Sequence, residues 1–108
     1  MESLLLADFV TIARTSDVPA GQVRVFEVDG TGIALCNVDG AFYAIDDVCT
    51  HDGGPLGEGT LFGDLVECPR HGARFDVKTG QVRALPAVLP VRTYEVQVDG
   101  NEIKVKLD

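Results

Sequence analysis

Apolar and polar residues alternate with a period of two over much of this chain, which is the pattern of half-buried β-strands. The alternation is clearest over residues 22–28, and apolar runs follow at residues 33–36 and 41–45. Asp29-Gly30 and Asp39-Gly40 separate the three segments. Because Asp-Gly pairs between apolar runs are strong hairpin signals, the sequence predicts an antiparallel meander here.

The two ends of the chain carry the same signal. A strand is predicted around residues 9–13, and a hairpin over residues 92–107 turns at Asp99-Gly100. Between them, residues 85–90 are predicted to be extended, since two prolines stiffen this run. No helix of ordinary length is indicated, so the predicted fold class is all-β.

The middle of the chain differs in composition. Six glycines fall between residues 46 and 77, a region with little strand pattern outside residues 61–62 and 65–67. Such glycine density suits close backbone approach and positive φ angles. We interpret residues 1–108 as one domain in which about 46–77 form a loop-rich subdomain on an antiparallel β base.

Net charge and cysteine content limit the kinds of partner and the cellular compartment that the sequence suits. The chain has 108 residues and a net charge of −8, so nucleic acid and anionic membranes are poor partners, whereas a basic patch on another protein is a good one. The apolar run at residues 4–7 is too short for a signal peptide or a membrane span, and three cysteines leave little scope for a disulfide framework. We expect a cytoplasmic monomer.

Two short arms carry the candidate chemistry. Cys49-Thr50-His51 and Cys68-Pro69-Arg70-His71 use both histidines and two of the three cysteines. Two Cys and two His satisfy tetrahedral zinc, although zinc sites usually pair like residues within one arm. A two-iron cluster with cysteines on one iron and histidines on the other needs both residue types in each arm, so a [2Fe-2S] cluster is favoured over zinc.

These arms, with Gly72, Phe75-Asp76 and Thr79-Gly80, resemble those of the Rieske iron–sulfur proteins. The resemblance implies that Cys49 and Cys68 hold the inner iron of one [2Fe-2S] cluster and that His51 and His71 hold the outer iron. It also implies the Rieske fold, with residues 46–77 as the cluster-binding subdomain. The region around Pro86 then resembles the loop that shields one side of the cluster.

Three departures indicate which Rieske group the chain resembles. Gly54 and Arg70 stand where respiratory members have a bridging cysteine pair, and Ala73 and Phe75 stand where those members have hydroxyl donors, so a low reduction potential is expected. No histidine is left for the mononuclear iron of an oxygenase subunit. The chain therefore resembles the small ferredoxins, electron carriers without catalytic residues.

Such ferredoxins pass electrons from a flavoprotein reductase to a terminal oxygenase, as a component of aromatic-ring dioxygenase systems. Two alternatives stay open: the small subunit of an assimilatory nitrite reductase-like complex, and a structural zinc or redox-sensing module that binds a partner.

The neighbours of the arms have simpler expected roles. Asp46, Asp47 and Asp52 are expected to be solvated carboxylates, with a basic partner as the alternative. The segment Gly54-Pro55-Leu56 either forms an uncharged tip for docking or packs the loops together. Asp76 is expected to cap its own loop, and Cys36, within an apolar run, to fill core volume.

Overall fold

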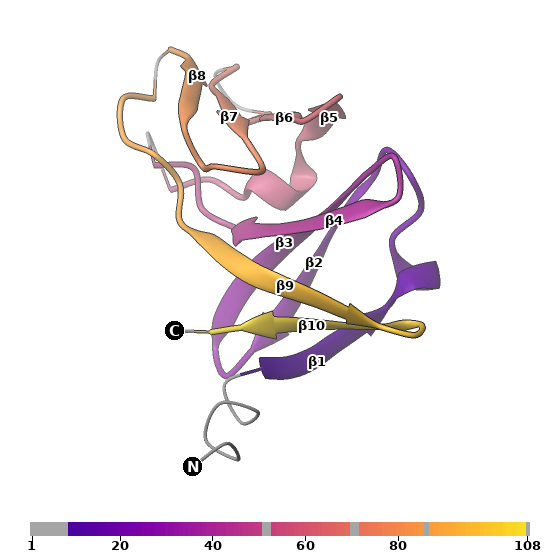
Figure 1. Cartoon of the computed structure of the whole chain (residues 1–108). Helices are drawn as coiled ribbons and strands as arrows, with labels where there is room; N and C mark the ends of the chain where they lie inside the picture. The colour runs from indigo at the N-terminus through magenta and orange to yellow at the C-terminus, as the bar shows by residue number, and fades with distance from the viewer. Residues whose placement is uncertain (1–8, 51–52, 70–71, 86, 108) are drawn as a thin grey trace.

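The computed structural model describes residues 9–50, 53–69, 72–85 and 87–107, and within them the fold is built from antiparallel strands in two sheets (Figure 1). The larger sheet has the order β1-β10-β9-β4-β3-β2, and the smaller has the order β5-β6-β7-β8. The larger sheet curls until β1 touches β2, which gives it a barrel-like shape. The predicted all-β class is confirmed.

The strands of the larger sheet are β1 (Phe9–Arg14), β2 (Val23–Val28), β3 (Thr31–Val38), β4 (Ala41–Asp46), β9 (Thr93–Asp99) and β10 (Glu102–Lys106). Those of the smaller are β5 (Thr60–Phe62), β6 (Leu65–Glu67), β7 (Arg74–Asp76) and β8 (Val82–Ala84). Two 3-10 turns, η1 (Thr15–Asp17) and η2 (Leu56–Glu58), are the helical elements in the described part of the chain. Neither is a helix with the length and apolarity needed to cross a bilayer.

Two of the three predicted Asp-Gly turns are present, whereas Asp99 stays in β9 opposite Glu102, so the third hairpin turns at Gly100-Asn101. Asp29 and Gly30 have φ angles of 51° and 80°, and Asp39 and Gly40 have φ angles of 53° and 92°. Each pair forms a two-residue loop, with Val28 opposite Thr31 in the first hairpin. Two consecutive positive φ angles match the right-handed twist of the strands they join, which explains why Asp-Gly fixes these registers.

Strand β3 is buried on both faces and separates two cores. One face carries Ile33 and Leu35, which lie inside the curled sheet in what we call the barrel core, with Ala13, Val18, Ala44, Tyr94, Ile103 and Val105. The other face carries Ala34 and Cys36, which pack against the smaller sheet in what we call the interface core. Alternate side chains of one strand therefore join the two halves of the molecule.

The interface core is where the candidate ligands lie. Its buried members are Val23, Ala34, Cys36, Ile45, Cys49, Leu56, Val66, Cys68, Ala73, Phe75, Val77, Ala87 and Val91. They come from β2, β3 and β4 on one side and from the smaller sheet and its loops on the other. The fold thus places both candidate cysteines between the two sheets.

Candidate metal centre

The first arm begins three residues after β4 ends. The backbone N–H of Cys49 donates to the carbonyl of Gly54 at 2.7 Å, and the N–H of Gly53 donates to the carbonyl of Cys49 at 2.7 Å. Gly53 has a φ of 77°, a conformation that favours glycine. These two bonds close a loop over residues 49–54, which contains His51.

The second arm follows β6 and repeats this arrangement. The N–H of Cys68 donates to the carbonyl of Ala73 at 2.7 Å, and the N–H of Gly72 donates to the carbonyl of Cys68 at 3.2 Å. Gly72, like Gly53, comes four residues after its cysteine, and its φ is 78°. The described ends of the two arms are therefore closed by equivalent backbone bonds, a similarity that the spacing of the histidines conceals.

Both candidate cysteines are deeply buried. Cys49 and Cys68 are each 1% exposed, and both belong to the interface core. Two cysteine sulfurs on loops with equivalent backbone bonds, both buried in one apolar core, suit a group that both arms hold together. His51 and His71 lie outside the described residues, as do Asp52, Arg70 and Pro86, so the four-ligand set stays a prediction.

The surroundings of the two cysteines are apolar. Ala73 and Phe75, which stand where respiratory members have hydroxyls, are both fully buried in the interface core. Cys36 is also fully buried there, which confirms its expected role in filling the core, and burial raises the pKa of its thiol to about 12. It is therefore a protonated thiol at neutral pH.

Two of the acidic residues beside the first arm are not plain solvated carboxylates, so that expectation is wrong for them. The N–H of Gly57 donates to Oδ1 of Asp47 at 2.6 Å, and the hydroxyl of Tyr94 donates to Oδ1 of Asp46 at 2.8 Å. Asp46 and Asp47 thus bind the end of β4 to η2 and to β9. Sequence reasoning missed both contacts, because each partner is distant along the chain.

Two further expectations about the loops can be compared with the structure. Leu56 is fully buried in the interface core, so it packs the loops together and does not belong to an exposed tip. Asp76 caps its turn as expected: its Oδ1 accepts bonds from the backbone N–H of Lys78 at 2.8 Å and of Thr79 at 3.3 Å.

The connection between β8 and β9 lies against the first arm. The hydroxyl of Thr50 donates to the carbonyl of Leu89 at 2.6 Å. Ala87, two residues earlier, is fully buried in the interface core with the two candidate cysteines. Within the described part of residues 85–91, Leu89 is therefore hydrogen-bonded to the first arm, and Ala87 packs in the interface core with the two cysteines.

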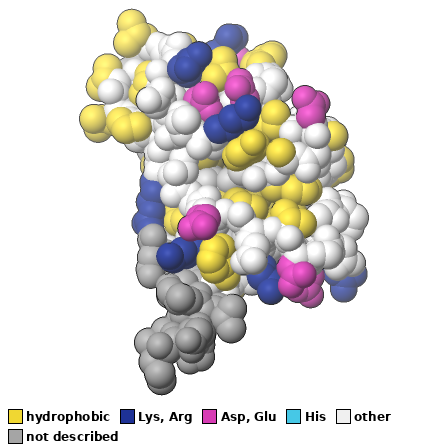
Figure 2. Space-filling model, in the orientation of Figure 1, with side chains coloured by type: hydrophobic (Ala, Val, Ile, Leu, Met, Phe, Trp, Pro, Cys, Tyr) yellow, Lys and Arg dark blue, Asp and Glu magenta, His cyan; other side chains and the backbone are white. Residues whose placement is uncertain are grey.

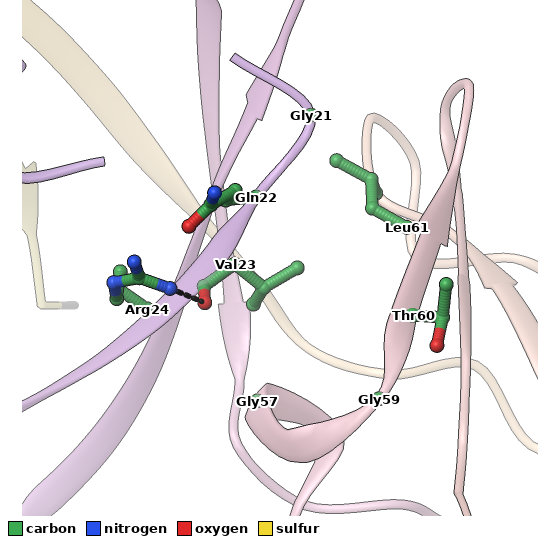
Figure 3. Close-up of a pocket in the computed structure, with 8 residues that line it drawn as sticks. All are labelled: Gly21, Gln22, Val23, Arg24, Gly57, Gly59, Thr60 and Leu61. Carbon is green, nitrogen blue, oxygen red and sulfur yellow. Dashed lines mark hydrogen bonds between the residues drawn. The ribbon is translucent and has the colours of Figure 1, made fainter. Parts of the chain in front are cut away.

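A groove of about 300 Å³ lies elsewhere on the molecule, between residues 21–24 and the segment from η2 to β5. Figure 3 shows the side chains of Val23 and Leu61 extending into it from opposite sides. Its other lining groups are mainly glycine backbone and the side chains of Gln22, Arg24 and Thr60. Neither candidate cysteine lines this groove, so it is separate from the metal centre.

Comparison with known proteins identifies the class. The model of the Rieske [2Fe-2S] domain family matches residues 8–95, and the chain belongs to this family. A Rieske-type [2Fe-2S] cluster is accordingly its cofactor, and the buried thiols on two equivalent loops fit such a cluster.

The relatives narrow the class to ferredoxins. The chain is 41% identical over 97 residues to the ferredoxin component of biphenyl 2,3-dioxygenase from Rhodococcus jostii, covering 90% of this chain and 91% of the relative. It is 45% identical over 93 residues to the 3-phenylpropionate/cinnamic acid dioxygenase ferredoxin subunit from Escherichia coli K12, covering 85% and 87%. The chain is a Rieske-type electron carrier of this kind.

Solved structures agree with this assignment. A chain from the complex of reduced oxygenase and oxidized ferredoxin in carbazole 1,9a-dioxygenase matches with a TM-score of 0.86 and 37% identity, covering 91% of this chain and 92% of that one. A structure described as a nitrite reductase NADPH small subunit matches with a TM-score of 0.76 at 22% identity, covering 90% and 96%. The second likeness concerns the fold alone.

Proposed function

We propose that this chain passes single electrons from a flavoprotein reductase to the terminal oxygenase of an aromatic-ring dioxygenase system. The observation that carries the proposal is the pair of equivalent loops that bury Cys49 and Cys68 in one core. The ferredoxin names of the relatives support the role, and the carbazole complex supports an oxygenase as acceptor. A cytoplasmic location stays a prediction from the sequence.

The proposed ligands are Cys49 and Cys68 for the inner iron, and His51 and His71 for the outer iron. When bound, the cluster supplies a centre that takes up and releases one electron. The protein keeps water away from the two cysteine sulfurs, because the other side chains of their core include Leu56, Ala73, Phe75 and Ala87, all fully buried. With no hydroxyl at residues 73 and 75, we expect a potential toward the low end of the roughly −150 to +300 mV Rieske range.

Three buried cysteines in one core allow a controlled test of the ligand set. We expect Cys49→Ser and Cys68→Ser to lose iron and labile sulfide, because each removes a thiolate ligand. Cys36→Ala is the matched control, since Cys36 is equally buried in the same core but lies on β3. The assignment would be contradicted if the Cys36 variant lost the cluster while the Cys49 and Cys68 variants kept it.

The histidine ligands need a spectroscopic test. His71→Cys is expected to retain iron while its paramagnetic spectrum shifts toward that of an all-cysteine cluster, because a thiolate replaces an imidazole. An unchanged spectrum would remove His71 from the ligand set. Zinc and no iron in the unsubstituted protein would favour the structural zinc alternative.

Electron transfer itself is tested anaerobically. The reduced protein is mixed with the oxygenase of carbazole 1,9a-dioxygenase, and oxidation of the carrier is followed by its visible absorption. Transfer that depends on the concentration of this chain supports the proposal. Failure to oxidise the reduced carrier at micromolar concentrations of both proteins would argue against an oxygenase as acceptor.

A further inference from the structure

The outer face of the smaller sheet carries paired charges. Val66 and Phe75 are fully buried in the interface core, so their neighbours Glu67 and Arg74 point to the opposite face. Among the described residues, three ion pairs lie on this sheet or its turns: Glu67–Arg74, Asp64–Lys78 and Asp76–Arg83. Figure 2 shows basic and acidic side chains beside one another at the top of the molecule, over the smaller sheet of Figure 1.

The first of these pairs borders the second ligand arm. Glu67 and Arg74 are directly opposite in the ladder of β6 and β7, and Nη2 of Arg74 lies 3.5 Å from Oε1 of Glu67. Cys68 follows Glu67 in the chain, and its N–H donates to the carbonyl of Ala73, which precedes Arg74. The ion pair is therefore the cross-strand pair at which the arm leaves the sheet and returns to it.

The carboxylate of Glu67 also lies against the arm itself. A Cβ atom built on Gly72 would lie 3.4 Å from Oε2 of Glu67, which is van der Waals contact. Gly72 is the positive-φ glycine whose N–H donates to the carbonyl of Cys68 at 3.2 Å. One oxygen of this carboxylate therefore faces Arg74, and the other faces the backbone of the arm.

The guanidinium of Arg74 is held on a second side by an aromatic ring. Its central carbon lies 5.1 Å from the centre of the Phe62 ring, a distance at which the cation is attracted to the ring. This contact gives a role to Phe62, which is 48% exposed on the edge strand β5. The positive charge of Arg74 is thus fixed between Phe62 and Glu67, close to the arm.

Both charges are near enough to act on a group bound by the arm. Their side chains are 42% exposed for Arg74 and 30% for Glu67, and an ion pair this exposed contributes little to folding stability. Adjacent Cα atoms are 3.8 Å apart, so the Glu67 carboxylate lies within roughly 10 Å of the Cys68 sulfur, about one Debye length at 0.1 M salt. A negative charge at this distance disfavours the addition of an electron, and a positive charge favours it.

We propose that Glu67 and Arg74 set the reduction potential of the cluster through opposing charges, Glu67 lowering it and Arg74 raising it. The inference rests on the proposed function, because it concerns the cluster that Cys68 is proposed to hold. The Asp64–Lys78 pair provides a comparison within the same sheet. Asp64 precedes β6, whereas Cys68 follows it, so this pair lies at the end of β6 away from the arm.

The test is a spectroelectrochemical titration of the cluster-loaded full chain at low salt. Glu67→Gln is expected to shift the reduction equilibrium constant about threefold toward the reduced form, which raises the potential by about 30 mV for one electron. Arg74→Gln is expected to shift it by a similar factor in the opposite direction, because the Glu67 charge is then uncompensated. The double variant is expected to return close to the potential of the unsubstituted chain.

Four controls separate charge from packing. Asp64→Asn and Lys78→Gln break an ion pair of similar exposure, 45% and 47%, and are expected to leave the potential unchanged. Arg74→Lys keeps the positive charge, and Phe62→Leu removes the ring but keeps both charges, so both variants are expected to retain the potential. The shifts in the Glu67 and Arg74 variants should shrink at about 0.5 M salt, where exposed charges are screened.

Each outcome decides the inference. Shifts of the same sign in Glu67→Gln and Arg74→Gln would indicate disturbed packing and overturn it, as would equal shifts in the Asp64 and Lys78 variants. Iron content and visible spectra establish that each variant holds the cluster. If the unsubstituted chain reduces the oxygenase and neither Glu67→Gln nor Arg74→Gln shifts the potential, the proposed function stands and the inference is wrong. If the unsubstituted chain binds no [2Fe-2S] cluster, both proposals fail.

Discussion

Asp47 joins the first ligand arm to the β base, and its removal should loosen the cluster. The carboxylate accepts the N–H of Gly57 at 2.6 Å, and the N–H of Asp47 donates to the carbonyl of Gly32 at 3.0 Å. Asp47 therefore ties η2 to β3 two residues before Cys49. Since η2 carries the fully buried Leu56, this junction closes one side of the interface core.

The size of the effect can be worked from this one contact. A hydrogen bond to a charged acceptor contributes about 1.5–3 kcal/mol, and Asp47→Ala leaves the N–H of Gly57 without that acceptor. If the free energy of local opening of the first arm falls by about 2 kcal/mol, the fraction of molecules with an open arm rises roughly 30-fold. Asp47→Asn keeps an acceptor oxygen without the charge, so roughly a fivefold rise, or about 1 kcal/mol, is expected.

The assay is the rate at which a strong iron chelator removes the cluster, measured beside the free energy of unfolding in denaturant. We expect the chelation rate to rank Asp47→Ala above Asp47→Asn, and both above the unsubstituted chain. Two results would refute the reasoning: equal rates for the two variants, or an Asp47→Ala variant that unfolds more easily while its chelation rate is unchanged.

Three further predictions concern the rest of the framework. Burial, with the hydrogen bond to Asp46 as the second cause, raises the pKa of Tyr94 from 10.0 to about 12. The contribution of the protonated Tyr94 hydroxyl to the free energy of unfolding is therefore complete below pH 10 and is lost between pH 10 and 12, by about 2–3 kcal/mol. Tyr94→Phe should remove this part of the loss of stability at alkaline pH, measured by denaturant unfolding. An equally steep loss in both proteins would contradict this prediction. Gly59→Ala should destabilise strongly, by about 2–4 kcal/mol, because its Cβ would overlap a backbone carbonyl of β6. Gly57→Ala should cost less and be rescued by Val25→Ala, since the side chain of Val25 is the main obstacle there; unfolding midpoints without rescue would show that the backbone is the obstacle.

The parts of this fold that could be predicted are those controlled by neighbouring residues. The Asp-Gly hairpins follow from two consecutive positive φ angles, and Asp76 caps a turn whose N–H groups lie two and three residues away. The cysteine and histidine spacing likewise belongs to two short segments. In each case the physical cause acts over a few residues, so it is visible in the sequence.

The parts that could not be predicted depend on contacts between distant segments. Strands β7 and β8 have three residues each, and they are defined by pairing with strands from other segments, β7 with β6 and β8 with β7. Thr50 meets Leu89 across 39 positions, and Asp47 meets Gly57 across ten. In the run at residues 85–90, composition alone does not reveal that Ala87 faces inward and its larger neighbours face solvent.

The equivalence of the two arms, which grow from different sheets, places the proposed cluster between the two sheets. Each arm begins at a buried cysteine and is closed by the same pair of backbone bonds, with a positive-φ glycine four residues on. The first arm grows from β4 of the larger sheet and the second from β6 of the smaller one. A group held by both arms therefore ties the two sheets together, so its loss should loosen the interface core more than the barrel core, whose members come from the larger sheet and the turn that follows β1.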